Sequence, residues 1–137
     1  MSPFLTRAQE LRASTTPHFN CAQSVLVPFA EHAGYTTEQA CAFAAAFGGG
    51  MQTGNLCGAF TGALMALGVL GIASRPNVTA LTRRMRDNHD GTLLCVDLLR
   101  KNAKAGGERK PHCDAMVYEA ISLVEEFLAE ELQKADS

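Results

Sequence analysis

Apolar residues recur at intervals of three and four positions along most of this chain, which is the period of an amphipathic helix. The clearest case lies near the C-terminus, where Val117, Ile121, Val124 and Leu128 follow this spacing. No stretch alternates apolar and polar residues over a useful length, so we expect no β-sheet. The pattern predicts an all-α protein, a compact bundle of five or six helices that forms one domain over residues 1–137.

Capping residues and helix breakers predict where the helices begin and end. Asn20 with Gln23, and Thr36 with Gln39, have the spacing of a capping box. Pro111 suits the first turn of the last helix. The expected helices are 3–14, 20–34, 36–47, 56–73, one from 77 to a break at 90–91, a short continuation over 93–101, and one from 111 onward, with a loop over 102–110.

A glycine-rich, uncharged stretch, residues 48–62, forms a loop that leads into the most apolar helix, residues 56–73. This apolar run is only about 18 residues long, which is the lower limit for a membrane span. It contains several glycines and has no flanking Trp or Tyr anchor. We therefore expect no membrane span but a central buried helix, in which Gly58 and Gly62 allow a neighbouring helix to approach closely.

Composition limits the partners and the compartment. The formal net charge is −2 and no basic stripe occurs, so we expect no nucleic-acid partner. Basic pairs such as Arg109-Lys110 are interpreted as solvated loop ends. No signal-peptide pattern is visible, which predicts a cytoplasmic location. In a reducing compartment, cysteines favour metal binding or transient redox chemistry over permanent disulfides.

Four of the five cysteines, Cys21, Cys57, Cys95 and Cys113, fall where helices are expected to begin. Unpaired backbone N–H groups and the helix dipole at such a position lower the pKa of a thiol, which favours a nucleophile or a metal ligand. Cys57 is the strongest candidate, because a flexible loop precedes it and Gly58 follows it. The alternative for each is a small buried hydrophobic residue. Cys41 lies in mid-helix, so we assign it to the core.

The spacing of the cysteines excludes several classes of redox protein. No two cysteines form a Cys-x-x-Cys pair, which argues against thioredoxin-like dithiols, zinc knuckles and ferredoxin-type runs. A site assembled from four separate helices remains open, because a bundle can bring distant helix starts to one end. His112, beside Cys113, is an additional candidate metal ligand.

These residues resemble a bacterial and archaeal family described as putative redox-active proteins with the C_GCAxxG_C_C motif. Residues 57–62, with the sequence CGAFTG, match its central element, and residues 48–51 resemble its glycine stretch. The resemblance covers nearly the whole chain and implies that Cys21, Cys57, Cys95 and Cys113 are the family cysteines. Cys41 has no counterpart. A similar cysteine module occurs in split-Soret cytochromes, but this chain has no Cys-x-x-Cys-His, so no covalent haem is expected.

Three functions are open at this point. In the first, Cys21, Cys57, Cys95 and Cys113 bind an iron–sulfur cluster or a metal ion for electron transfer or redox sensing, with Gly58 beside the cofactor. In the second, the protein is a metal-free dithiol–disulfide oxidoreductase with Cys57 as the reactive thiolate. In the third, it is a non-catalytic helical protein that binds a partner. A redox partner is expected for the first, and the last helix or the glycine-rich helix offers a surface for a homodimer.

Overall fold

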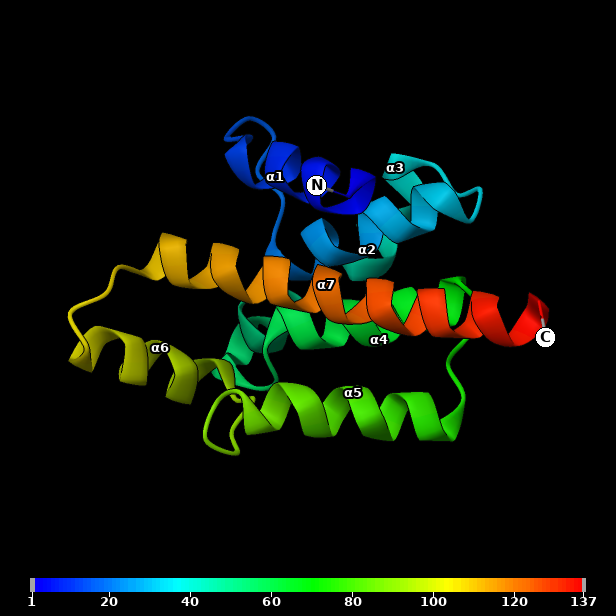
Figure 1. The fold of residues 1–137 in the computed structure, drawn as a ribbon. Coiled ribbons are helices and arrows are strands. Elements are labelled where there is room, and N and C mark those ends of the chain that lie inside the picture. Colours follow the sequence, from blue (N-terminus) through cyan, green and yellow to red (C-terminus); the bar gives the residue numbers. More distant parts are fainter. Residues whose placement is uncertain (1, 137) are drawn as a thin grey trace.

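Seven α-helices and one short π-helical segment make up the part of the chain that the computed structural model describes, residues 2–136 (Figure 1). These residues contain no strand, which confirms the all-α class. The helix number exceeds the predicted five or six, partly because α6 is a separate helix and not a continuation of α5. The elements are α1 (Pro3–Ala13), α2 (Cys21–His32), α3 (Thr37–Ala44), η1 (Gly50–Gly54), α4 (Gly58–Val69), α5 (Arg75–Asp87), α6 (Cys95–Lys104) and α7 (Arg109–Asp136).

Both predicted capping boxes are present. The Asn20 side chain accepts a hydrogen bond from the Gln23 N–H at 2.8 Å, and the Gln23 side chain accepts one from the Asn20 N–H at 2.9 Å. Thr36 and Gln39 make the same exchange at the start of α3. These local bonds explain why the starts of α2 and α3 could be predicted from sequence.

Two predicted helix starts are wrong by a few residues. Ser74, not Asn77, caps α5, since its hydroxyl accepts from the Asn77 N–H. The Asn77 side chain is buried and donates to the Ile72 carbonyl and to Glu131. The last helix starts at Arg109, two residues before Pro111, so the loop between α6 and α7 is shorter than predicted. This shift places the Arg109-Lys110 pair inside the helix.

The core is centred on α2 and α4. Residues 25–27 of α2 and Phe29 are completely buried, although Pro28 lies among them. Gly62 in α4 allows the close approach, because a Cβ at that position would lie 2.8 Å from the Ala22 carbonyl oxygen. Helix α7 runs the length of the molecule beside them (Figure 1), and its apolar face, from Met116 to Phe127, is buried.

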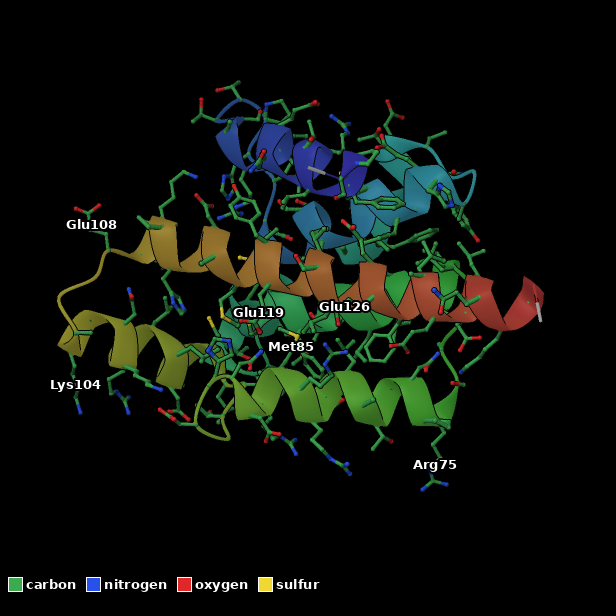
Figure 2. All side chains as sticks on the ribbon, in the orientation of Figure 1. Arg75, Met85, Lys104, Glu108, Glu119 and Glu126 are labelled. Atoms are coloured by element: carbon green, nitrogen blue, oxygen red, sulfur yellow. The ribbon has the colours of Figure 1, made fainter. Side chains whose placement is uncertain are left out.

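Helix α5 covers another side of the core. Met85 of α5 is fully buried and points toward the core, whereas Arg75 at the start of α5 points into solvent (Figure 2). Glu126 of α7 forms an ion pair with Arg84 of α5, and Glu119 of α7 hydrogen-bonds to His89, just after the end of α5. Helix α4 has 12 residues, and none of the helices in residues 2–136 is long and apolar enough to cross a membrane.

Candidate functional site

The four cysteines that the sequence singles out meet at one end of the bundle, although their helices are far apart in the chain. They line a single cavity of about 30 Å³, which is room for only one or two water molecules. Gly58 and His112, the other predicted site residues, line the same cavity, whereas Cys41 does not. The lining residues are Cys21, Gly49, Cys57, Gly58, Cys95, Leu98, Leu99, Arg109, His112, Cys113 and Met116. All five cysteines are free.

A short antiparallel backbone bridge holds two of these helix starts together. The Cys57 N–H donates to the Leu93 carbonyl at 2.7 Å, and the Cys95 N–H donates to the Asn55 carbonyl at 2.6 Å. Cys57 is the N-cap residue of α4, and Cys95 is the first residue of α6. The bridge therefore fixes the positions of both residues relative to each other.

The glycine-rich segment before α4 is a defined left-handed turn. Four consecutive residues, 49–52, have positive φ, and two of them, Met51 and Gln52, are not glycine. Each non-glycine residue in this conformation costs about 1–2 kcal/mol. The glycine at position 50 is required, because a Cβ there would lie 2.5 Å from the Asn55 carbonyl oxygen and 2.8 Å from Cys95 Cβ. The turn thus brings Gly49 to the cavity wall and packs against α6.

Gly58 allows the start of α4, next to Cys57, to pack closely against the start of α2 at Cys21. A Cβ at this position would lie 2.9 Å from the Phe47 carbonyl oxygen and 3.2 Å from Cys21 Cβ. Any larger residue here would push the start of α4 away from Cys21. The glycine of the CGAFTG element therefore sets the distance between α4 and α2 at the cavity.

Cys57 is the most deeply buried cysteine, with 6 % of its surface exposed. Burial raises the pKa of its thiol to about 11, although the backbone N–H groups of Ala59 and Phe60 act in the opposite direction. The prediction of a lowered pKa at this position is therefore wrong, because burial outweighs the effect of the helix start. At neutral pH Cys57 is a protonated thiol.

Cys21 and Cys113 form the most strongly interacting pair of thiols. A hydrogen bond between their side chains lowers the pKa of Cys113 and raises the pKa of Cys21, and burial raises the pKa of Cys21 further. Arg109 and Arg12 also lower the pKa of Cys113. Within the pair, Cys113 is therefore the thiol that ionises more readily, and Cys21 is the thiol that retains its proton. Because α7 starts at Arg109, Cys113 lies one turn inside the helix and not at its start.

Arg12, which no sequence pattern singled out, is held beside this pair by two hydrogen bonds. Its side chain is 7 % exposed, and its Nε donates to Asp114 Oδ1 at 2.7 Å while Nη1 donates to the Phe19 carbonyl at 3.0 Å. Lys110 Nζ donates to Asp114 and to the Arg12 carbonyl, each at 3.0 Å. These partners lower the pKa of Asp114 despite its partial burial. The network joins α1 to the first turns of α7.

An open groove of about 350 Å³ leads from solvent to the cysteine pair. Cys21, Gly49, Arg109 and Cys113 line both this groove and the inner cavity, so the pair lies at the boundary between them. The remaining groove residues are Arg12, His18, Asn20 and Lys110. Arg109 and Lys110 are exposed, as predicted, but they belong to the first turn of α7 and not to a loop end, and both lie on the wall of the groove.

The donor types at the cavity suit a metal, but their arrangement does not form a site. Four thiols and an imidazole are ligands for zinc, and four thiolates for an iron–sulfur cluster. Within residues 2–136, however, no three His, Cys, Asp or Glu side chains are arranged to hold a metal ion. His112 is partly buried, and this burial lowers the pKa of its imidazole.

The fold and the site define a small all-α protein that gathers four free cysteines around one cavity beside a solvent-open groove. In a comparison with protein families, residues 19–127 match the family described as "Putative redox-active protein (C_GCAxxG_C_C)". The chain belongs to this redox-active family, which confirms the resemblance seen in its sequence. A search of curated proteins and a search of solved structures gave no significant match.

Proposed function

We propose that this protein is a dithiol–disulfide redox protein in which Cys113 is the nucleophile and Cys21 is the resolving thiol. The observation that carries the proposal is that Cys21 and Cys113, whose side chains share a hydrogen bond, line one open groove together with Arg12 and Arg109. A nucleophilic thiol must be ionised, accessible and close to a second thiol. Cys113 meets these three requirements, and Cys57, which is nearly completely buried, does not.

The exchange consists of two thiolate attacks. The Cys113 thiolate attacks a substrate disulfide, forms a mixed disulfide and releases the first substrate thiolate. Cys21 then loses its proton to that leaving group, attacks the Cys113 sulfur and releases the second substrate thiolate. The protein dithiol is oxidised to a Cys21–Cys113 disulfide, and the substrate disulfide is reduced to two thiols. Charge on Arg109 and Arg12 supports the ionised form of Cys113 before the first step.

The test is the stoichiometry of reaction with 4,4′-dithiodipyridine, an uncharged chromogenic disulfide. We expect the reduced protein to release two thiopyridone molecules in a fast phase. Cys113→Ser should abolish this phase, and Cys21→Ser should release one molecule and retain the other as a mixed disulfide visible by mass spectrometry. Cys41→Ser is the matched control, because Cys41 does not line the cavity or the groove.

Cys57→Ser distinguishes the proposed nucleophile, Cys113, from the nucleophile predicted from the sequence, Cys57. We expect the fast phase to persist in this variant if circular dichroism shows an intact fold. If Cys57→Ser abolishes the fast phase and Cys113→Ser retains it, Cys57 is the nucleophile and our assignment is wrong.

A metal or iron–sulfur site is a second candidate function, favoured by the four thiols that line one cavity. Cys21, Cys57, Cys95 and Cys113 would supply the ligands, with His112 next to them, and binding would require the cavity to expand. The test is the iron, sulfide and zinc content of protein purified without oxygen. Metal near one equivalent, lost in both Cys57→Ser and Cys95→Ser, supports this candidate, and metal-free protein contradicts it.

A further inference from the structure

The groove that leads to the cysteine pair is lined by basic side chains. Arg12, Arg109 and Lys110 contribute three cations to its wall, and none of its eight lining residues is acidic. A groove of about 350 Å³ is in the range of a small-molecule site. Its size and charge together favour a small anionic ligand over a protein surface.

The carboxylate near the groove is already engaged. Asp114 accepts from both Arg12 and Lys110, so its single negative charge is shared between two cations and one net positive charge remains. Arg109 has no carboxylate partner among residues 2–136 and instead faces the Cys113 thiolate. Glu108, the neighbouring carboxylate, projects outward at the turn between α6 and α7 (Figure 2) and is exposed.

The charge of the groove rises during the proposed reaction. While Cys113 is a thiolate, it neutralises part of the charge on Arg109 and Arg12. When the mixed disulfide forms, this negative charge leaves with the first substrate thiolate. Two guanidinium groups then face a neutral sulfur, so a carboxylate on the bound half of the substrate would replace the lost negative charge.

We infer that the oxidant is a small-molecule disulfide that carries carboxylates, and that Arg109 binds a carboxylate while Cys113 attacks the sulfur. This inference rests on the proposed function, since it names the substrate of the same thiol pair. The reaction is the same thiol–disulfide exchange at Cys113 and Cys21. The protein dithiol becomes a disulfide, and the substrate becomes two thiols that each carry a carboxylate. The carboxylates are not altered and serve only for recognition.

The experiment compares three disulfides of similar length and different charge: 3,3′-dithiodipropionate, 2-hydroxyethyl disulfide and cystamine. Oxidation of the reduced protein is followed by acid quenching and intact mass, and the same three rates are measured with free dithiothreitol to correct for intrinsic reactivity. After this correction, we expect the dicarboxylate to react about tenfold or more faster than the diammonium compound. We expect the preference to shrink in about 1 M salt, where the Debye length is about 3 Å.

Arg109→Gln should bring the ratio of the dicarboxylate rate to the diammonium rate close to one, and it should also slow the reaction with all three disulfides, because Arg109 helps to lower the pKa of Cys113. Arg75→Gln is the matched control, because Arg75 is exposed at the start of α5 and does not line the groove. If the native protein reacts with the dicarboxylate and the diammonium disulfide at similar corrected rates, the inferred substrate class is wrong, but the proposed thiol exchange stands. No reaction with any of the three disulfides would overturn the proposed function and the substrate class together.

Discussion

At the scale of single residues, the two thiols with the most different surroundings are Cys57 and Cys113. Cys57 has the position expected to activate a thiol, at the N-cap of a helix, but burial raises its pKa to about 11. Cys113 lies one turn inside α7, and its pKa is lowered by Cys21, Arg109 and Arg12. Hydrogen bonds and neighbouring charge therefore matter more here than the helix start.

The pH dependence of alkylation tests this difference. Because the pKa of Cys113 is lowered, its iodoacetamide reaction should approach its maximum below the ordinary thiol pKa of about 8.5. Cys57 and Cys41 should react only at higher pH, since burial raises the pKa of both. Cys21→Ala removes the main cause of the lowered pKa and should shift the Cys113 midpoint to higher pH.

Peptide mass spectrometry at each pH gives the midpoint for every cysteine separately. Cys41→Ala is the control and should leave the Cys113 midpoint unchanged, because Cys41 lies outside the cavity. A Cys113 midpoint at or above that of Cys41 would show that the assignment of charge within the pair is wrong.

At the scale of elements, small residues on α4 set how closely α2 can pack. The two glycines of the CGAFTG element, Gly58 and Gly62, both face α2, and a Cβ at either would lie under 3.0 Å from a backbone oxygen. Gly68 lies on the same helix, but a Cβ there would have no atom within 4 Å. The same helix therefore contains a glycine in close contact, Gly62, and a glycine with open space around it, Gly68. Alanine substitutions at these two positions can be compared directly.

Gly62→Ala should destabilise the fold by about 1–3 kcal/mol, because the added carbon meets the Ala22 backbone at 2.8 Å and the backbone cannot move cheaply. Gly68→Ala should be neutral or stabilising by up to about 1 kcal/mol, since alanine favours a helix more than glycine does. Urea unfolding followed by circular dichroism measures both free energies of unfolding. Equal effects of the two substitutions would mean that α2 and α4 do not approach as closely as described.

At the scale of the whole molecule, the Cys21–Cys113 pair connects α2 near the N-terminus to α7 near the C-terminus. The Arg12–Asp114 ion pair likewise joins α1 to α7 across 102 positions. A disulfide between Cys21 and Cys113 would therefore close a loop that contains most of the protein, and the redox state should affect global stability.

Oxidation should stabilise the protein against unfolding. A disulfide that closes a loop of about 90 residues restricts the unfolded chain and contributes up to about 5 kcal/mol. We expect the oxidised protein to unfold at a higher urea concentration than the reduced protein, with peptide mapping showing a Cys21–Cys113 link. In Cys113→Ser, the oxidant should leave the unfolding midpoint unchanged. A link that maps to other cysteines, or no change in midpoint on oxidation, would contradict this prediction.

Sequence pattern alone predicted the all-α class, the two capping boxes and the family, because helix periodicity, caps and the CGAFTG element are local features. The same local rules failed where partners are distant in the chain. Arg12 acts on Cys113 from another helix, and the burial of Cys57 depends on how α4 packs among its neighbours. The ionisation of each thiol, and the cationic groove that reaches the Cys21–Cys113 pair, follow from tertiary packing, since charge and burial depend on spatial neighbours and not on sequence neighbours.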